Sequence, residues 1–255
     1  DGDVVVVSEL ESSMLTCRAV SVTEVQILAI KKHLGIASMP AKYVEDAINL
    51  LSPLYKDYLE VRESVLVTSM SNLNAIVHPI VTMLNCSTID NHHKFLYYRQ
   101  GVSPCVASML ERADMERIAI GHAMGVEVTS LYLWAKRLYE GKISGSGLYD
   151  FFHTNDAYEA VMSPNDLETR YIWEDIPTGM LPMIECAELF EVPVPILRTV
   201  YSMACILFQK DWKENARTLS SLGLNDLSAE ELKEYAMTGK RNTTNVNKQK
   251  NSHTL

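Results

Sequence analysis

A basic surface is the first thing that this sequence lacks. Its 23 lysines and arginines are outnumbered by 32 aspartates and glutamates, which gives a formal net charge of −9 at pH 7. Proteins that bind nucleic acids carry a basic patch or stripe that neutralises phosphates, and nothing in this chain provides one. The acidic balance favours solubility and excludes no class of enzyme. We therefore expect no nucleic-acid partner.

The sequence also lacks the patterns of a membrane-spanning helix and of a signal peptide. No apolar run reaches the roughly 18 residues that a membrane-spanning helix needs. The chain opens DGDVVVV, without an initiator Met and without the charged-then-apolar pattern of a signal peptide. We expect no membrane partner.

The cysteines lack any close pair. None of them forms the C-x-x-C spacing that is typical of zinc sites, so we predict no metal site. Most lie in apolar contexts, where a free thiol packs as a small hydrophobic residue. The five positions are Cys17, Cys86, Cys105, Cys186 and Cys205. This odd, scattered set favours a reducing, cytoplasmic location.

A glycine-rich turn for binding phosphate is absent too. No G-x-G-x-x-G follows a strand near the start of the chain. The nearest glycine-rich stretch, KISGSGLYD at 142–150, contains Gly145 and Gly147 but follows a predicted helix instead of opening one. We interpret it as a flexible link. The phosphate-binding half of a dinucleotide site is therefore not expected within this chain.

What is present is a short β-rich start. Hydrophobic residues make up 47% of the 255 residues, enough to bury a sizeable core. Runs of β-branched residues predict strands at 4–7, 17–22, 25–30 and 65–67. These strands are too few to close a stable sheet of their own. They look like the end of a larger sheet whose earlier strands are absent.

From Ser69 onward the spacing of apolar residues predicts helices. Helices are predicted at 69–85, 104–124, 126–139, 178–190, 195–210 and 228–235, after an earlier one at 42–51. The last begins with a capping box, Ser228 to Glu231. We expect a solvated face with local ion pairs from four residues of the long helix, Glu111, Asp114, Glu116 and Arg117. The fold class is thus mainly α: a partial α/β layer at 1–68, an all-α part at 69–238 and a disordered polar tail at 239–255.

The most informative segment is SMSNLNAIVHPIVTMLN at 69–85. Its polar residues recur every three to four positions and share one face of a helix: Asn74, His78, Thr82 and Asn85. The other positions are apolar, which predicts a buried helix. Unpaired buried polar groups cost roughly 1–3 kcal/mol each, so the stripe needs partners or a wet cleft. His78 is then either a core histidine satisfied by its neighbours or a functional one, and Pro79 predicts a local break beside it.

A second polar group lies in ETRYIWEDIPTGMLP at 168–182. Arg170, Glu174 and Asp175 alternate there with large apolar residues. One interpretation is a solvent-facing turn whose acids complement the dipole of the next helix. The other pairs Asp175 with His78, because a carboxylate fixes the tautomer of an imidazole and stabilises its charged form for acid–base work. The residues alone do not decide between them.

Four segments together resemble the octopine/nopaline (opine) dehydrogenase family. SNLNAIVHPIVTMLN resembles the family's helix with an Asn-x-x-x-His-Pro element, and RYIWEDIP resembles its Arg-Tyr-x-x-Glu-Asp-x-Pro element. ESSMLTCRAV resembles the segment that enters the second domain, Glu-Ser/Thr-x-x-x-x-Cys-Arg. LFEVPVPILRTVYSMACILFQKDWKENARTLSSLGL resembles the family's closing helices. The four occur in the family's order, over about residues 4–224.

The resemblance implies a two-domain enzyme. Such enzymes have an N-terminal Rossmann domain that binds NADH or NADPH, then an all-helical domain like the C-terminal one of 6-phosphogluconate dehydrogenase. They condense the amino group of an amino acid with the carbonyl of a 2-oxo acid, often pyruvate, and reduce the imine with hydride. Residues 1–68 would then be the end of the Rossmann domain with a linker helix, and 69–238 the catalytic domain. The expected cofactor is NAD or NADP.

The resemblance also assigns roles to individual residues. His78 matches the acid–base histidine of the family, and Asp175 matches its aspartate partner. Arg170 matches the arginine that holds the oxo-acid carboxylate, a task that suits the planar guanidinium. Three more positions are predicted to bind substrate, Asn74 in the His-Pro element and, at the amino-acid site, Glu11 and Cys17.

Several alternatives stay open. The chain is either part of a longer enzyme, with its Rossmann domain supplied in cis or in trans, or a standalone relative; its start at Asp1 without Met favours the first. The main alternative function is a non-enzymatic helical binding protein of the same fold. A ketopantoate-type reductase shares the architecture but gives no reason for the two polar elements. The sequence does not fix the amino acid, the choice between NADH and NADPH, or whether a homodimer forms.

Overall fold

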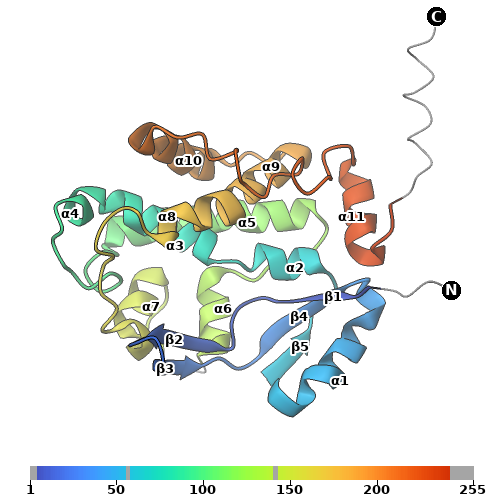
Figure 1. Ribbon diagram of the computed structural model, residues 1–255, viewed down its shortest axis with the longest axis horizontal. Coiled ribbons are helices and arrows are strands. Elements are labelled where there is room, and N and C mark those ends of the chain that lie inside the picture. Colours follow the sequence, from blue (N-terminus) through green and yellow to red (C-terminus); the bar gives the residue numbers. More distant parts are fainter. Residues whose placement is uncertain (1–4, 56–57, 140–142, 242–255) are drawn as a thin grey trace, which may run out of the picture.

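The computed structural model describes residues 5–55, 58–139 and 143–241 (Figure 1). Near its start lies a three-stranded sheet with the strand order β1–β4–β5. The strands are β1 (Val7–Leu10), β4 (Leu34–Met39) and β5 (Leu59–Val61). β1 pairs antiparallel with β4, and β5 pairs parallel with β4 after a crossover through α1 (Val44–Tyr55). This crossover unit is the partial α/β layer that the sequence predicts.

The central strand β4 is not predicted from the sequence. Its residues LGIASM are buried almost throughout, but three of them are small, which hides the β-branched pattern of a buried strand. One of them, Gly35, has a packing reason. A Cβ at Gly35 would lie 2.4 Å from Glu11 Oε2 and 2.6 Å from Arg62 Nε. The absence of a side chain there leaves room for an ion pair beside the sheet.

A separate antiparallel hairpin is formed by β2 (Leu15–Ala19) and β3 (Val25–Ile30). The strand predicted at 25–30 is confirmed. The strand predicted at 17–22 begins two residues earlier and ends at Ala19, because the chain turns between Val20 and Glu24, whose backbone groups are hydrogen-bonded at 2.9 Å. The strand predicted at 4–7 meets β1 only at Val7, and residue 4 lies outside the described residues.

The strand predicted at 65–67 is wrong. These residues open the helix α2 (Val65–Met70). Ser64 caps it, since its hydroxyl accepts a hydrogen bond from the backbone N–H of Leu66 at 3.1 Å. A good N-cap together with burial of the apolar side chains outweighs the β preference of Val65 and Val67.

The helix predicted at 69–85 is divided in two. α2 ends at Met70, and α3 (Asn74–Leu84) follows after Ser71–Leu73. The predicted break at His78 is wrong, because Pro79 lies inside an unbroken α3. The division comes earlier, where the hydroxyl of Ser71 donates to the carbonyl of Val67 at 2.8 Å and competes with the backbone ladder.

The remaining helices surround α3. α5 lies beside α3 in the middle of the molecule, with α9 and α10 on one side and α2, α6 and the sheet on the other (Figure 1). Their bounds are α4 (Cys86–Asp90), α5 (Pro104–Ala123), α6 (Leu131–Leu138), α7 (Leu148–Thr154), α8 (Arg170–Trp173), α9 (Leu181–Leu189), α10 (Pro195–Phe208) and α11 (Ala229–Thr238). Short turns are η1 (Ala41–Tyr43), η3 (Asp156–Tyr158) and the π-helical η4 (Ile176–Met180).

Most of the predicted helices are confirmed, with shifted ends. The helices predicted at 104–124 and 195–210 are α5 and α10, and the capping box at Ser228 and Glu231 opens α11. The helix predicted at 126–139 starts only at Leu131, because Ser130 caps it there. The division into domains at 1–68 and 69–238 stays a prediction. The predicted boundary, residue 69, falls inside α2. The tail predicted from Gly239 lies outside the described residues after 241.

Residues 65–84 pass a test for membrane-spanning helices that the sequence analysis does not anticipate. Taken as one segment, α2 and α3 are long and apolar enough, with a mean hydropathy of 1.2 over the best window. However, 72% of that window is buried inside the protein. We interpret the segment as core helices.

The charged face expected on α5 is mostly buried. Arg117 is fully buried, and Asp114 and Glu116 are almost as inaccessible, so the predicted solvated face is wrong at these positions. Each carboxylate of this set accepts hydrogen bonds from the start of a neighbouring helix. Asp114 accepts from Leu131 N of α6 at 2.7 Å, and Glu116 accepts from Ile196 N and Leu197 N of α10 at 2.8 and 3.0 Å. Glu111, which is exposed, accepts from Leu148 N of α7 at 3.0 Å.

Arg117 forms an ion pair with Asp114 on the same helix. Its guanidinium donates to Asp114 Oδ1 from Nε at 2.8 Å and from Nη2 at 2.6 Å. It also donates to the carbonyls of Met70 and Thr129, both at 2.7 Å. Burial lowers the pKa of Arg117, and the carboxylate of Asp114 opposes that shift. One buried cation therefore ties α5 to the end of α2 and to the start of α6.

We expect Arg117→Met to destabilise the protein by about 3–5 kcal/mol, because it leaves the charge of Asp114 buried without its partner. The measurement is the free energy of unfolding in urea, followed by circular dichroism.

Arg112→Met is the matched control, since Arg112 is exposed on the same helix. We expect it to change the free energy of unfolding by no more than about 0.5 kcal/mol. Equal effects of the two substitutions would show that the buried pair does not hold the helices together.

Candidate active site

The two polar segments that the sequence singles out meet in the core. His78 on α3 and Asp175, the residue before η4, are each 6% exposed. His78 Nδ1 lies 2.7 Å from Asp175 Oδ2. The imidazole also stacks on the ring of Tyr171, with centroids 4.0 Å apart. A carboxylate on Nδ1 fixes the tautomer, so that the proton sits on Nδ1 and Nε2 is left to accept.

A close approach of two backbones makes this pairing possible. η4 packs directly on the first turn of α3, and a Cβ at Gly179 would lie 2.6 Å from the Cβ of Ala75. Any side chain at Gly179 would force η4 away from α3. Because Asp175 immediately precedes η4 and His78 is one turn after Ala75, that displacement would lengthen the hydrogen bond between them. Single π-helical turns often occur at functional sites.

The other ring nitrogen of His78 faces a tyrosine. Nε2 lies 3.2 Å from the hydroxyl of Tyr98. Burial raises the pKa of Tyr98 well above its ordinary value, so the phenol keeps its proton and donates to Nε2. Tyr97 supports the same turn, since its hydroxyl donates to the backbone carbonyl of His78 at 3.1 Å and lies 2.8 Å from Thr82 Oγ1. Neither tyrosine stands out in the sequence, because adjacent aromatic residues are typical of an ordinary core.

The polar stripe of α3 is fully accounted for. His78 and Thr82 have the partners just described. The amide of Asn85 donates to the carbonyls of Val81 and Gly101 at 2.8 and 3.0 Å. Asn74, at the first position of α3, is exposed on the wall of a cavity. The prediction that these polar residues meet partners or a wet cleft is therefore confirmed.

This cavity has a volume of about 790 Å³ and lies between the β2–β3 hairpin and the helices α3, α6, α7 and α8. Five of the six residues predicted for the site line it: Glu11, Cys17, Asn74, His78 and Arg170. The sixth, Asp175, is not in its wall and reaches it only through His78. Aromatic residues of α6, α7 and η3 close one side: Trp134, Tyr139, Phe151, Phe152 and Tyr158.

Arg170 presents a cation to the cavity. It is the first residue of α8, where Thr169 caps the helix, and its side chain is exposed. Among the ion pairs of the described residues, none involves Arg170. Its guanidinium is thus available for a carboxylate of a ligand.

Glu11 and Cys17 occupy the hairpin side. Glu11 is 5% exposed, and its carboxylate pairs with Arg137 Nη2 at 2.6 Å and with Arg62 Nε at 3.4 Å. Its charge is therefore already neutralised within the protein. Cys17 is exposed and follows an irregularity in the pairing of β2 with β3.

One cation of the cavity wall escapes the sequence analysis. Lys31 follows β3, and its Nζ lies 2.6 Å from Ser12 Oγ and 5.7 Å from the centroid of the Trp134 ring. In the sequence it belongs to a Lys-Lys pair, which reads as ordinary surface charge. Only the packing of α6 against the hairpin reveals that it is buried.

The chain resembles known proteins over most of its length. Opine dehydrogenase of Arthrobacter sp. (strain 1C) is 36% identical to it over 225 residues, which cover 88% of this chain and 62% of that protein. Vitopine synthase of Allorhizobium ampelinum (strain ATCC BAA-846 / DSM 112012 / S4) is 27% identical over 222 residues, 86% of this chain and 60% of that protein. The chain thus spans about six tenths of the length of these curated relatives.

The fold matches a solved structure of octopine dehydrogenase with NADH and L-arginine. The TM-score is 0.73 at 20% identity, over 92% of this chain and 65% of the other. A sequence model described as "NAD/NADP octopine/nopaline dehydrogenase, alpha-helical domain" matches residues 61–208, more than half of the chain. The chain therefore belongs to the octopine/nopaline dehydrogenase family.

Proposed function

We propose that this chain supplies the catalytic domain of an opine dehydrogenase. The proposed reaction is the NAD(P)H-dependent reductive condensation of an amino acid with a 2-oxo acid such as pyruvate. The observation that carries the proposal is the buried hydrogen bond between His78 and Asp175, because the same histidine also lines a cavity of about 790 Å³. Octopine dehydrogenase has been solved with NADH and L-arginine and with NADH and pyruvate, which supports substrates of these two classes.

In the proposed mechanism His78 carries one proton between the two substrates. The amino acid arrives as an ammonium ion, and Nε2 of His78 takes its proton. The free amine then attacks C2 of the oxo acid, and its nitrogen forms a bond to that carbon. His78 returns the proton to the former carbonyl oxygen. This oxygen takes a second proton from the attacking nitrogen and leaves as water, and the nitrogen of the C=N bond that forms keeps the last of the three ammonium protons. Asp175 stabilises the imidazolium between these steps, and Tyr98 must yield Nε2 to the substrate.

Arg170 is proposed to hold the oxo acid. A planar guanidinium binds a carboxylate through two parallel hydrogen bonds, which fixes the orientation of the neighbouring carbonyl carbon. The position of Arg170 on the same cavity wall as His78 supports this role. Asn74, Glu11 and Cys17 line the rest of the proposed substrate site.

The described residues do not provide the phosphate cradle of a nicotinamide cofactor. After β4 the chain enters η1 through Pro40, and no glycine-rich turn joins a described strand to a helix. We therefore propose that a Rossmann domain in cis or in trans holds NADH or NADPH, which would supply the hydride. Apolar side chains left exposed beside the sheet support such a neighbour: Val5, Val6 and Val7 around β1, with Leu50 and Leu54 on α1.

A non-enzymatic binding protein is the second candidate. The observation in its favour is the same lack of a cradle among the described residues. The two proposals differ in one measurement, the oxidation of NADH or NADPH by the native protein with pyruvate and a panel of amino acids. We expect the native product, detected with an antibody against this chain, to be larger by a Rossmann domain of on the order of 100–150 residues and to oxidise the cofactor. A product of this size alone without such oxidation would favour the binding protein.

We expect His78→Ala to lower kcat of the native enzyme by roughly 10²–10⁴-fold, the usual contribution of a general acid–base. Asp175→Asn should lower kcat in the same direction, because it removes the charge that stabilises the imidazolium. Binding of NADH, measured by fluorescence, should stay unchanged in both variants. His122→Ala is the control, since His122 is exposed at the end of α5. Full turnover by His78→Ala would contradict the acid–base assignment.

We expect Arg170→Lys to raise KM for the oxo acid by roughly 10–100-fold, because a point charge replaces a two-bond grip worth about 1.5–3 kcal/mol. KM for the amino acid should change far less. Arg198→Lys is the matched control, since Arg198 forms an exposed pair with Glu188 and is not among the residues that line the cavity. A KM for pyruvate that is equal in all three proteins would remove Arg170 from the site.

A further inference from the structure

Lys31 is a buried cation that the proposed mechanism does not use. Its side chain is 8% exposed and lines the same cavity as His78 and Arg170. Its backbone N–H donates to the carbonyl of Met14 at 2.8 Å, which fixes the residue at the open end of the hairpin. The Nζ atom is held by Ser12 Oγ at 2.6 Å and lies over the ring of Trp134.

Within the part of the chain that the structure describes, no carboxylate forms an ion pair with this ammonium. The nearby carboxylate of Glu11 is already bound to Arg62 and Arg137. A charge that is buried without a counter-ion lowers the stability of the folded protein. A ligand that brings an anion to Nζ would remove this cost.

The lowered pKa of Lys31 agrees with an ammonium group that has no bound anion. Burial lowers the pKa of Lys31 from 10.5 to about 8, while the nearby Cys17 and Glu11 oppose that shift. Arg137 on α6 and Arg62 are further charged groups near it, and Glu11 engages both. An anion bound at Nζ would raise the pKa again, so ligand binding and protonation of Lys31 favour each other.

We propose that the ammonium of Lys31 binds a carboxylate of the amino-acid substrate. This inference rests on the proposed function and adds the residue that would select the second substrate. The product of the proposed condensation carries two carboxylates, one on each side of a secondary amine. The cavity wall offers two cations without an acidic partner in the described residues, Arg170 and Lys31. One cation for each carboxylate matches the charge of such a product.

The carboxylate is either the α-carboxylate or that of an acidic side chain. Both place the same chemical group on Nζ, and substrate pairs separate them. L-Glutamate and L-glutamine differ only in the side-chain charge, whereas L-methionine and L-methioninamide differ only in the α-carboxylate. In either case the ammonium of Lys31 disfavours a cationic side chain beside it, such as that of L-lysine.

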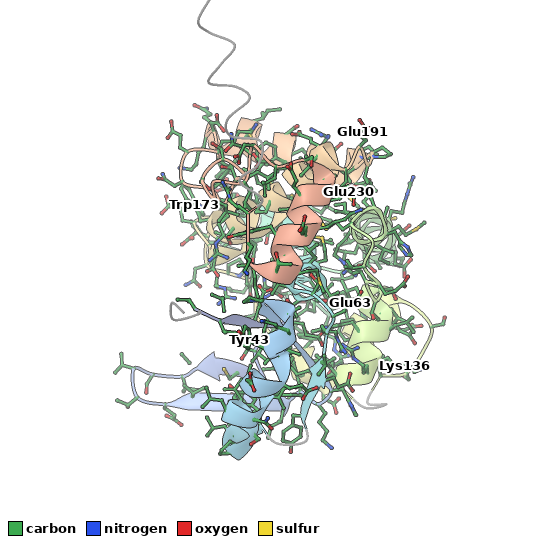
Figure 2. The ribbon with its side chains drawn as sticks, turned by 90° about the vertical axis from the view of Figure 1, so that its right-hand side faces the viewer. Tyr43, Glu63, Lys136, Trp173, Glu191 and Glu230 are labelled. Atoms are coloured by element: carbon green, nitrogen blue, oxygen red, sulfur yellow. The ribbon has the colours of Figure 1, made fainter. Side chains whose placement is uncertain are left out.

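The test is the binding of these probes to the 255-residue chain by isothermal titration calorimetry, with pyruvate present. We expect Lys31→Met to weaken binding of the responding probe by roughly 10-fold or more, the loss of one charge-assisted hydrogen bond. Lys136→Met is the matched control, because Lys136 lies on the exposed side of α6 at the edge of the molecule (Figure 2). It should bind every probe as the unchanged chain does.

A pH series distinguishes a ligand contact from a purely structural lysine. Nζ binds an anion only while it is protonated, so affinity should fall as the pH rises through about 8. Lys31→Met should lack this fall, and Lys31→Arg should keep the affinity without the fall, because guanidinium stays charged. The ammonium of the probe also titrates, but it does so equally in all variants. Circular dichroism of each variant checks that it is folded.

Weaker binding of L-glutamate alone would assign the side-chain carboxylate to Lys31. Weaker binding of all three α-carboxylate probes, with no binding of L-methioninamide to the unchanged chain, would assign the α-carboxylate. Equal affinities in Lys31→Met and Lys136→Met, or no binding of any probe to the unchanged chain, would overturn the inference. The proposed function is tested separately by oxidation of NADH, so the two can fail independently.

Discussion

The structure depends on a set of buried charges carried by one helix, α5. Arg117 and Asp114 form an ion pair inside the core. Three acids of the helix accept hydrogen bonds from the first turns of three other helices: Asp114 from α6, the exposed Glu111 from α7 and Glu116 from α10. A helix N-terminus leaves backbone N–H groups without partners, so a fixed carboxylate sets where the next helix can start. In this way α5 determines the positions of α6 and α7. Those two helices carry most of the aromatic residues that line the cavity. The shape of the cavity therefore depends on the hydrogen bonds that join α5 to α6 and α7.

The proposed acid–base pair depends on a second constraint, the close packing of η4 against α3. His78 and Asp175 are separated by 97 positions in the sequence. They meet because Gly179 lets two backbones approach to a distance that no side chain would permit. Stacking on Tyr171 and the hydroxyl of Tyr98 then leave the imidazole little freedom. The proposed catalytic group is thus held in its working orientation before any substrate arrives.

Local patterns predict the parts of this structure that depend on neighbours in the sequence. The capping box at Ser228, the span of α5 and the polar stripe of α3 all follow from spacing alone. Tertiary contacts decide the rest. Whether Arg117 or Lys31 is buried depends on helices that are distant in sequence, and charged residues on a helix or after a strand read as solvated by default. Gly35 makes the central strand hard to predict, because glycine is uncommon in strands. Its missing side chain leaves space for the carboxylate of Glu11. The roles of the six predicted site residues stay predictions, although their shared location agrees with them.

The β2–β3 hairpin lies outside residues 61–208, the part of the chain that matches the family's helical domain. It nevertheless forms one wall of the cavity and, with the residue that follows it, contributes both Cys17 and Lys31. The proposed acid–base pair is built entirely from helices. Evolution can therefore alter the hairpin, residue by residue or as an exchanged loop, while the proposed acid–base pair remains intact. A division of this kind gives a lineage of enzymes a simple route to new substrates, and it makes the hairpin the natural segment to graft when such an enzyme is redesigned.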